Sequence, residues 1–400
     1  MTSTRALVGR FGSPLYIYEL SVLREARCDL ARQLPADSSL VYSVKANPHP
    51  RLIEELHRMG CGVEVSSIGE LDAALAAGVP AADVVHNGPA KTNAEISHAL
   101  SSSVGLFSVD SVAQLRRLGD VASGRGQTVS ALMRVNADTA VSGAGLTMTG
   151  TASQFGVDAA QIAQDPAAFA HPNVAVRGLH FYLGTNVARE EDLIATFRTA
   201  LEHTAVLRRL LPGPIEILDL GGGFAAPYGR SGARSQYPRL RAVLTELLAA
   251  FAPERPRVLF ESGRYLTAEC GRLAATVQDV KESKGRIFVL LDSGINHLGG
   301  MAGLRRVPPL MPELSAADEP PAEVIESDVV GPLCTPLDCW HRRAALPAVR
   351  PGDVVEVPNV GAYGLTGSLI GFLSHEPPTE VVVDHGEPVH ISRLSLIRTA

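Results

Sequence analysis

The chain alternates between short apolar runs and amphipathic segments from about residue 38 to residue 262. Each apolar run ends in a polar or glycine-rich turn, as buried parallel strands do. The runs that we interpret as strands are 39–44, 61–65, 83–86, 105–109, 130–135, 174–181, 215–219 and 257–261. Eight strands separated by helices favour a (β/α)8 barrel of the TIM type. A doubly wound open sheet of eight strands satisfies the same pattern and stays open at this point.

The segments between these runs carry apolar residues at helical spacing. Ser111 precedes one such segment as an N-cap, and the acidic residues 190–192 open another, where negative charge suits a helix N-terminus. The apolar positions are Leu52, Ile53, Leu56 and Met59; Leu71, Ala74, Leu75 and Gly78; Val112, Leu115 and Leu118; Leu193, Ile194, Phe197, Leu201 and Leu207; and Leu240, Val243, Leu244, Leu247 and Leu248.

The pattern changes after about residue 264. Runs rich in β-branched residues follow one another with Gly and Pro between them, and no long helical pattern appears. These runs are 273–280, 286–291, 324–330, 353–357 and 380–383. We therefore predict an α/β protein with a barrel over 25–263 and a mostly β domain formed by 1–24 plus 264–400. The Pro-rich, Ala-rich and acidic segment 305–323 is predicted to be a surface loop or poorly ordered.

Composition narrows the classes of function. The chain has 400 residues, enough for two domains, and 46% apolar residues, enough for a large core. A net charge of -6, one Trp and 5% aromatic residues argue against a nucleic-acid partner. No apolar run approaches the roughly 20 residues of a membrane span, and the first residues lack the apolar region of a secretory signal.

The five cysteines are odd in number and form no CxxC pair. They predict neither a disulfide framework nor a metal site. We expect a cytoplasmic protein with reduced thiols.

A lysine ends the first strand of the predicted barrel. Lys45 follows the apolar run 39–44, and Asn47-Pro48 then turns the chain into a helix. A lysine at the carboxyl end of an inner strand is expected to have a partly desolvated ammonium, whose lowered pKa suits a Schiff-base lysine. A lysine that extends its charge to solvent explains the position equally well.

Chemistry in a β/α barrel lies at the carboxyl ends of the strands. Polar residues and glycine-containing segments occupy these positions in a coherent set. They are Lys45; Glu64, Ser66, Ser67 and Glu70; Arg134 and Asn136; His180 to Asn186; Asp219 to Phe224; and Glu261 to Tyr265.

Two of these segments suggest a phosphate site. Gly221-Gly222-Gly223 lets the backbone approach a ligand closely, and Ser262-Gly263-Arg264 adds a guanidinium after the next strand. The loops after strands seven and eight are the usual phosphate site of this fold, although a triple glycine is more often a turn. A phosphate site opposite a lysine suggests pyridoxal phosphate, with Glu261 facing the pyridine nitrogen. A simple salt bridge between Glu261 and Arg264 is the alternative.

Over nearly its whole length the chain resembles the pyridoxal-phosphate-dependent decarboxylases of the alanine-racemase-like fold (fold type III), which include diaminopimelate and ornithine decarboxylases. Six motifs in order carry the resemblance: Tyr42–Asn47, the cofactor-lysine motif; Leu218–Phe224, the phosphate loop; Glu261–Tyr265, with Ser for the usual Pro; Asp292–Asn296; Gly331–Cys334 with Asp338; and Gly361–Gly364.

The resemblance implies a role for each site residue. Lys45 would hold the cofactor as a Schiff base, Glu261 would pair with its pyridine nitrogen, and Cys334 would protonate the product carbanion. The cofactor phosphate and ring would be held by Arg134, Tyr182, Gly222, Gly223, Gly263, Arg264 and Tyr363. The resemblance also implies a homodimer in which the loop with Cys334 and Asp338 enters the partner's site. For Cys334 a small buried residue, and for Tyr363 a core aromatic, are the simpler alternatives.

Two positions depart from the family pattern. Tyr182 stands where a stacking histidine is usual, in the segment His180-Phe181-Tyr182-Leu183-Gly184-Thr185. Tyrosine can stack but cannot carry a positive charge, and His180 itself fits a packed strand residue as well as a site residue. Thr335 follows Cys334 where an acidic residue usually reads the distal ammonium of a basic substrate.

These departures resemble a branch found in biosynthetic clusters for siderophores and antibiotics. With Thr185, Thr335 and Asp338 as substrate contacts, we expect decarboxylation of an L-amino acid or conjugate, such as carrier-tethered glutamate or a citrate conjugate. Diaminopimelate or basic amino-acid decarboxylation is the alternative. An amino-acid racemase is disfavoured by Glu261, and a non-catalytic carrier of the cofactor by the β domain. Arg305-Arg306 would meet an acidic substrate or carrier, although a solvated pair is the simpler interpretation.

Overall fold

The structure, a computed structural model, describes residues 3–137, 146–147, 152–211, 213–299, 311–317 and 323–399. Most of the predicted loop 305–323, including Arg305 and Arg306, lies outside these residues. The chain divides into two compact units. We call Arg24–Ala226 with Ser235–Leu266 the barrel unit, and Met1–Leu23, Pro227–Arg234 and Thr267–Ala400 the β unit. The segment Pro227–Arg234 therefore belongs to the β unit, although it lies inside the range 25–263 predicted for the barrel.

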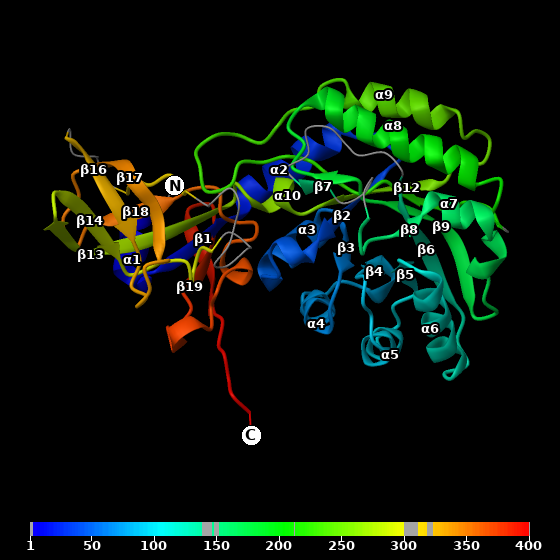
Figure 1. Ribbon diagram of the computed structural model, residues 1–400, viewed down its shortest axis with the longest axis horizontal. Helices are drawn as coiled ribbons and strands as arrows, with labels where there is room; N and C mark the ends of the chain where they lie inside the picture. The colour runs from blue at the N-terminus through cyan, green and yellow to red at the C-terminus, as the bar shows by residue number, and fades with distance from the viewer. Residues whose placement is uncertain are drawn as a thin grey trace. The chain divides into compact units, whose positions relative to one another are not determined.

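Eight parallel strands close the barrel (Figure 1). They are β2 (Ser39–Ser43), β3 (Gly62–Val65), β4 (Val84–His86), β5 (Leu106–Val109), β6 (Val129–Asn136), β9 (Val174–Phe181), β11 (Ile217–Asp219) and β12 (Arg257–Ser262). Each strand pairs with the next in this order, and β12 pairs with β2, so the ring is complete. One of these pairings joins β5 to β6, with Leu106 opposite Ser130. Closure confirms the barrel and excludes the open sheet. All eight predicted strands are present, with ends shifted by no more than two residues.

Helices follow the strands, and side-chain caps start several of them directly after a strand end. They are α2 (Leu20–Gln33), α3 (Pro50–Arg58), α4 (Ile68–Ala76), α5 (Asn93–Ser101), α6 (Val112–Ser123), α7 (Ala159–Gln164), α8 (Glu190–Leu207) and α9 (Leu240–Ala249). Ser111 accepts a hydrogen bond from the Gln114 amide at 3.1 Å, which confirms the predicted N-cap. Thr92 and Glu95 form a capping box at α5. These short turns keep the strand ends and helix starts close together.

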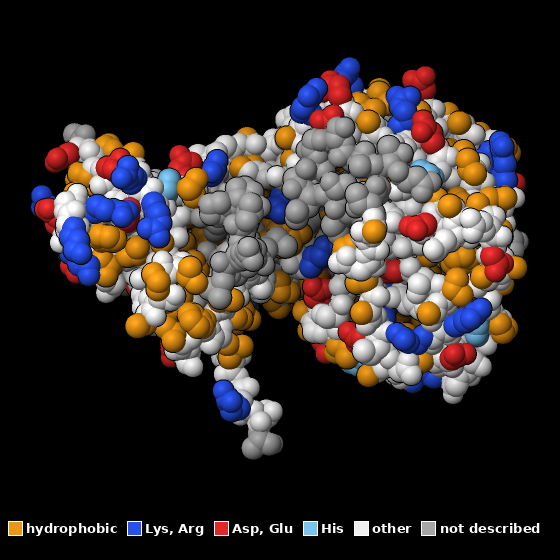
Figure 2. Space-filling view, viewed as in Figure 1, with side chains coloured by type: hydrophobic (Ala, Val, Ile, Leu, Met, Phe, Trp, Pro, Cys, Tyr) orange, Lys and Arg blue, Asp and Glu red, His pale blue; other side chains and the backbone are white. Residues whose placement is uncertain are grey.

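Aromatic side chains fill the space around the end of β12 in the barrel unit. Phe224 packs against Phe197, Phe260, Tyr237 and Tyr265, with ring centroids 5.9 to 6.4 Å apart. On the outside, basic and acidic side chains intermix over α8 and α9 (Figure 2). One such contact is the ion pair of Arg239 with Glu190 and Glu191. The helices thus present a solvated face, while their apolar faces cover the barrel.

The β unit is mainly one sheet, with the short α1 (Thr4–Phe11) packed on it. Its strands are β1 (Leu15–Glu19), β13 (Gly271–Ser283), β14 (Arg286–Leu291), β15 (Ser315–Ala316), β16 (Val324–Val330), β17 (Cys339–Pro347), β18 (Val354–Val357), β19 (Thr379–Asp384) and β20 (Glu387–Arg393). Leu7 of α1 joins a buried cluster with Leu15, Ile17, Val381 and Val383. The second, mostly β domain is therefore confirmed as a fold.

Four strands of the β unit, β1, β15, β17 and β20, were not among the predicted runs. Of these, β17 and β20 escaped the sequence pattern because they are not apolar runs. In β20 half-buried and exposed positions alternate over the whole strand. In β17, Arg342 and Arg343 interrupt the apolar residues, and Arg343 adopts a positive φ of 54° where the pairing with β16 shifts register. Half-solvated and bulged strands leave little trace in a search for continuous apolar segments.

Within the described ranges, no helix is both long and apolar enough to cross a membrane. All five cysteines carry free thiols; Cys61 and Cys270 are buried, and Cys334 is exposed.

Candidate active site

Lys45 lies in a single 3-10 turn (Val44–Ala46) between β2 and α3. Its Nζ is 3.2 Å from both carboxylate oxygens of Glu64, which is buried at the end of β3. The Lys45 side chain is 41% exposed while its amine contacts a buried carboxylate. The turn carries Lys45 beyond Ser43, the last residue of β2 that pairs with β3. The site therefore offers an accessible amine held against a buried carboxylate.

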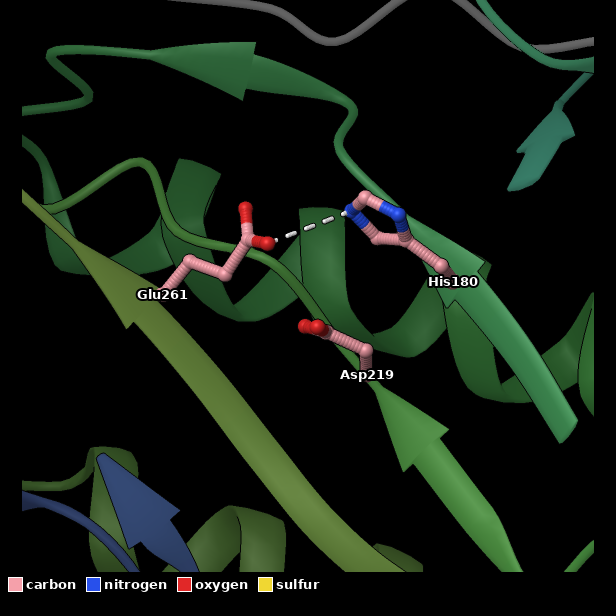
Figure 3. A group of neighbouring side chains, drawn as sticks. All are labelled: His180, Asp219 and Glu261. Carbon is pink, nitrogen blue, oxygen red and sulfur yellow. Dashed lines mark ion pairs between the residues drawn. The ribbon is translucent and has the colours of Figure 1, made fainter. Parts of the chain in front are cut away.

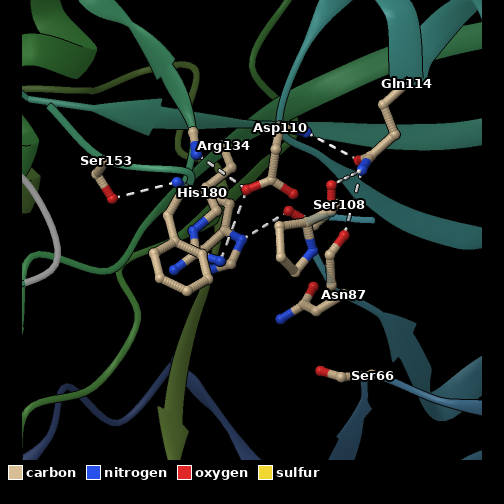
Figure 4. Close-up of polar contacts among 12 residues, drawn as sticks. Ser66, Asn87, Ser108, Asp110, Gln114, Arg134, Ser153 and His180 are labelled. Atoms are coloured by element: carbon tan, nitrogen blue, oxygen red, sulfur yellow. Dashed lines mark hydrogen bonds and ion pairs between the residues drawn. The ribbon is translucent and has the colours of Figure 1, made fainter. Parts of the chain in front are cut away.

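An aromatic ring lies beside this amine. The ring centroid of Tyr182 is 5.5 Å from Lys45 Nζ and 5.9 Å from the guanidinium carbon of Arg134. Arg134 also packs over the ring of Phe155 at 4.8 Å, and its Nη1 is 3.7 Å from Asp110 Oδ1 (Figure 4). Tyr182 thus lies within cation–π distance of two cations. Its face is placed where a planar ligand bound to Lys45 would stack.

The glycine segment after β11 packs its backbone against neighbouring strands. Gly221 has a φ of 68°, and a Cβ on this residue would collide with the carbonyl oxygen of Phe181. A Cβ on Gly222 would collide with the carbonyl oxygen of Glu261. The Gly221 carbonyl accepts a hydrogen bond from the Glu261 amide at 2.8 Å. The Gly223 carbonyl accepts one from the Val187 amide, also at 2.8 Å. Within the described part of the chain, the amides of Gly222 and Gly223 donate to no acceptor. Two unpaired N–H groups on a side-chain-free loop suit a bound anion.

The second glycine segment adjoins the lysine turn. Gly263 directly follows β12, and a Cβ on it would lie 2.6 Å from the Cβ of Ala46. Arg264 comes next and begins the four-residue helix α10 (Arg264–Thr267). The structure thus brings the segments after strands one, seven and eight of the barrel together, as the sequence predicted.

Glu261 lies in a buried cluster with His180 and Asp219 (Figure 3). Its Oε1 accepts a hydrogen bond from Asn87 Nδ2 at 2.9 Å and is 3.7 Å from His180 Nε2. Glu261 therefore pairs with His180, and the predicted alternative of a salt bridge to Arg264 does not occur. Its Oε2 accepts no hydrogen bond from any described residue, so this oxygen is available to a ligand.

The pKa values of the two carboxyls in the cluster are shifted in opposite directions. Burial raises the pKa of Asp219 well above its usual range, and the charge of Glu261 raises it further. Burial also disfavours the Glu261 anion, but the charge of His180, with those of Lys45 and Arg134, holds the Glu261 pKa below its usual range. Of the two neighbouring groups, Glu261 is the one that is ionised.

A further set of polar residues escaped the sequence reasoning (Figure 4). Asn87 directly follows β4 and Asp110 directly follows β5. Gln114 accepts from the Asp110 amide at 2.9 Å and from Lys91 Nζ at 3.1 Å, which ties the two strand ends together. Lys91 is buried, and burial lowers its pKa to about 8. The rule that selected Lys45 would have found Asn87 and Asp110 at the ends of the predicted strands 83–86 and 105–109.

In the β unit, the loop between β16 and β17 carries Cys334, Thr335 and Asp338. Asp338 is buried; its Oδ1 accepts from the Ile295 amide at 2.9 Å and its Oδ2 from the Leu333 amide at 2.8 Å. The substrate contact predicted for Asp338 stays a prediction, and its visible role is to hold the loop. Cys334 is exposed, so it is not the small buried residue of the simpler alternative.

Tyr363 and Thr185 lie in irregular segments. Tyr363, in the β unit, is half-buried and has a φ of 56°, a left-handed conformation that costs a non-glycine residue about 1 kcal/mol. Its carbonyl accepts from the Tyr228 hydroxyl at 2.8 Å. Thr185, in the barrel unit, belongs to β10 (Gly184–Thr185), which pairs with β7 (Leu146–Thr147). Thr185 thus follows Tyr182 by three residues, beyond the carboxyl end of β9.

These groups fit pyridoxal phosphate. The amine of Lys45 suits an aldehyde, the free Oε2 of Glu261 suits a protonated ring nitrogen, and the ring of Tyr182 suits the pyridine face. The unpaired amides of Gly222 and Gly223 suit a phosphate. All of them lie at the carboxyl ends of strands in the barrel unit.

Comparison with known proteins gives a consistent result. The profile of the pyridoxal-dependent decarboxylases, pyridoxal binding domain, matches residues 21–268. An L-glutamyl-[BtrI acyl-carrier protein] decarboxylase of Niallia circulans is 29% identical over 389 residues, with 95% of this chain and 91% of the relative covered. A diaminopimelate decarboxylase of Zymomonas mobilis is 30% identical over 374 residues, with 90% and 85% covered.

A solved structure supports the fold. The crystal structure of diaminopimelate decarboxylase from M. jannaschii in complex with L-lysine has a TM-score of 0.84 and 24% sequence identity. The match covers 96% of this chain and 90% of that one. Barrel and β domain therefore recur together in that enzyme.

Proposed function

This chain belongs to the pyridoxal-dependent decarboxylases, and we propose that its substrate is an L-amino acid whose distal end is conjugated or tethered to a carrier. The enzyme is a carboxy-lyase, and its cofactor is pyridoxal 5'-phosphate. The substrate, the role of each residue and the assembly are proposals, which we support in turn.

Lys45 would hold the cofactor covalently through its amine. Glu261 would face the ring nitrogen with Oε2, and Tyr182 would cover one face of the ring beside Arg134. The phosphate would be held by residues that the sequence selected: Gly222, Gly223, Gly263, Arg264 and Tyr363. The free oxygen of Glu261 and the unpaired glycine amides support these assignments within the barrel unit.

When bound, the cofactor supplies an electron sink for the pair of electrons left on Cα as carbon dioxide departs. The chain's residues set the conditions for this step. Glu261 keeps the proton on the ring nitrogen, because a buried anion stabilises the cation next to it. The amine of Lys45, when it is not bound to the cofactor, would be held against Glu64. Cys334 returns a proton to Cα and so completes the amine product.

The proposal about the substrate is based on the residues of the loop that contains Cys334. Among its residues 331–339, only Asp338 is acidic, and backbone amides occupy both of its oxygens. Thr335 therefore presents an uncharged hydroxyl, and the loop has no free carboxylate for a distal ammonium. Thr335 lines a cavity of about 380 Å³ whose lining is mixed, with apolar Phe288, Leu290 and Val330 beside charged Lys281, Asp328 and Arg342. The uncharged hydroxyl of Thr335 suits an amide or thioester linkage better than a cation.

The assembly that we propose is a homodimer in which this loop completes the partner's site. Cys334 is exposed, and the neighbouring Leu337 leaves 54% of its surface accessible. An exposed leucine beside a proposed catalytic cysteine suits a loop that becomes buried on assembly. Because conjugated and carrier-tethered substrates are proposed, we also propose that the enzyme acts in siderophore or other secondary-metabolite biosynthesis in the cytoplasm.

The alternative substrate is diaminopimelate, the substrate named for the 30% identical relative. A comparison of carbon dioxide release separates the two. The panel is carrier-linked L-glutamate, a citrate conjugate of diaminopropionate, free L-glutamate, meso-diaminopimelate, L-lysine and L-ornithine. We expect kcat/KM for a conjugated substrate to exceed that for every free basic amino acid by at least about a hundredfold, because only free basic substrates bring an unpaired ammonium to the loop.

Lys45→Ala serves as the inactive control for this panel. Preferred turnover of meso-diaminopimelate would overturn the proposal about the substrate. The Thr335→Glu variant adds a second check, since a carboxylate at this position should raise activity on basic amino acids and lower it on the carrier-linked substrate.

A further inference from the structure

Glu261 is held on one side only. It is 1% exposed, and Asn87 donates to its Oε1 while His180 Nε2 lies 3.7 Å from the same oxygen. Oε2 has no partner among the residues that the structure describes. Asn87 comes from the end of β4 and His180 from β9, so the two contacts reach Glu261 of β12 from different strands. Both contacts fall on the same oxygen and so favour one orientation of the carboxylate.

His180 is itself fixed from behind. It is 1% exposed, and its Nδ1 is 2.7 Å from the hydroxyl oxygen of Ser108 in β5. Its Nε2 is buried and has no hydrogen-bond partner at normal distance; the nearest carboxylate oxygen is Glu261 Oε1 (Figure 3). A buried ring nitrogen without a partner is costly unless it interacts with a charge. The interaction that the fold provides is the one with Glu261.

The surrounding charges decide which group of the cluster ionises. Asp219 of β11 faces Glu261 as a second carboxyl, and burial together with the Glu261 charge keeps its pKa raised. Lys45 and Arg134 add positive charge from the ends of β2 and β6. Among the neighbouring charges, that of His180 does most to lower the pKa of Glu261 against the effect of burial. Removing His180 should therefore make the Glu261 anion less stable.

We propose that His180 and Asn87 are positioning residues, which keep Glu261 ionised and leave its Oε2 turned toward the ring nitrogen of the cofactor. The proposal rests on the role of Glu261 in the proposed function. Neither residue needs to touch the substrate. Their effect passes through Glu261, so it should appear in cofactor binding and in pH dependence, and not only in turnover.

The test uses His180→Asn and His180→Gln in the full-length holoenzyme. The asparagine amide keeps a polar group near Nδ1 and loses the group that faces Glu261, whereas the glutamine amide reaches the Nε2 position. We expect His180→Asn to weaken pyridoxal phosphate binding about tenfold, measured by dialysis and visible absorbance. The acid limb of its pH–rate profile should move to higher pH, because a less stable anion is protonated sooner. His180→Gln should restore cofactor affinity to within about threefold.

His86→Gln is the matched control. His86 is also fully buried, lies on β4 next to Asn87, and has no interaction with Glu261. We expect wild-type cofactor affinity and an unshifted acid limb for this variant. Equal shifts in His86→Gln and His180→Asn would mean that the effect is general loss of packing, and would overturn the proposal.

Glu261→Gln separates this proposal from the one on which it rests. If Glu261→Gln leaves cofactor affinity and the pH profile unchanged, the role proposed for Glu261 fails. If it changes both while His180→Asn behaves like the control, the positioning role fails and the role of Glu261 stands. If His180→Asn does not fold, cofactor affinity and the pH–rate profile are measured for Asn87→Ser instead. Wild-type affinity and an unshifted acid limb in that variant would contradict the proposal.

Discussion

Lys45 and Glu64 form the contact at the centre of the site. The structure places the amine 3.2 Å from both oxygens of a buried carboxylate and leaves it accessible. A surface lysine that extends into solvent would not meet a carboxylate that is 1% exposed. The geometry therefore favours a functional amine over the alternative left open by the sequence.

Replacing Lys45 by alanine should abolish the visible absorbance of the purified protein, because the amine proposed to hold the cofactor, beside the Tyr182 ring, is then removed. Absorbance spectra of matched preparations check this. Lys281→Ala, at an exposed lysine of the β unit, should keep the wild-type spectrum. Persistence of the visible band in Lys45→Ala would show that another residue holds the cofactor.

Glu261 shows that a residue's identity is not enough to fix its role. The sequence left a salt bridge to Arg264 open, and only the fold brings Asn87 and His180 from two other strands onto one of its oxygens. The same applies to Asp338, whose two oxygens are used by backbone amides.

At the scale of elements, the turn after β14 contains a buried histidine that links β-unit stability to pH. His297 is 2% exposed, and its backbone carbonyl accepts from the Tyr16 hydroxyl at 2.7 Å. Burial lowers the pKa of His297 to about 4. The folded state thus holds this imidazole neutral, while the unfolded chain protonates it near its ordinary pKa of about 6.5.

The contribution of His297 to stability should be complete above about pH 6.5 and fall as the pH drops toward 4. Between pH 7.5 and pH 5 we expect the wild type to lose about 2 kcal/mol relative to His297→Gln, measured by urea denaturation of both proteins. The difference between the two proteins is measured because Glu380 also titrates in this range. Burial raises the pKa of Glu380 to about 7, and protonation of this carboxyl stabilises the folded state as the pH falls, in both proteins alike. A constant difference across this range would contradict the buried neutral histidine.

At the scale of the whole molecule, a shared site can be tested by mixing two inactive variants. Lys45→Ala removes the proposed amine from the barrel unit, and Cys334→Ala removes the proposed proton donor from the β unit. If the loop with Cys334 completes the partner's site, half of randomly mixed dimers contain one intact site. Activity should then return to about one quarter of the wild-type value.

Carbon dioxide release after denaturation and refolding of the mixture measures this recovery. Each parent refolded alone is the control, and Cys334→Ala should keep bound cofactor. Recovery no greater than the sum of the parents would exclude a site shared between subunits.

The sequence indicated an α/β architecture with eight parallel strands, because such strands are short apolar runs and their helices keep one apolar face, although the pattern alone also allowed an open sheet. All eight barrel strands and the Ser111 cap were predicted from these local patterns. Strand-end positions also selected Lys45, the glycine segments and Glu261. Weakly patterned elements such as β17 and β20 were missed, because half-solvated strands leave no apolar run.

Which groups meet depends on the three-dimensional fold. Barrel closure joins β5 to β6 and brings Asn87, His180 and Glu261 from the ends of three strands into one buried cluster. It also places Lys45 in a turn beyond the end of β2, with its amine against Glu64 of the neighbouring strand. Hydrogen-bond partners and charge states depend on residues far apart in the chain, so no local pattern contains them. The position of each reactive residue follows from the sequence, and its chemical state follows from the fold.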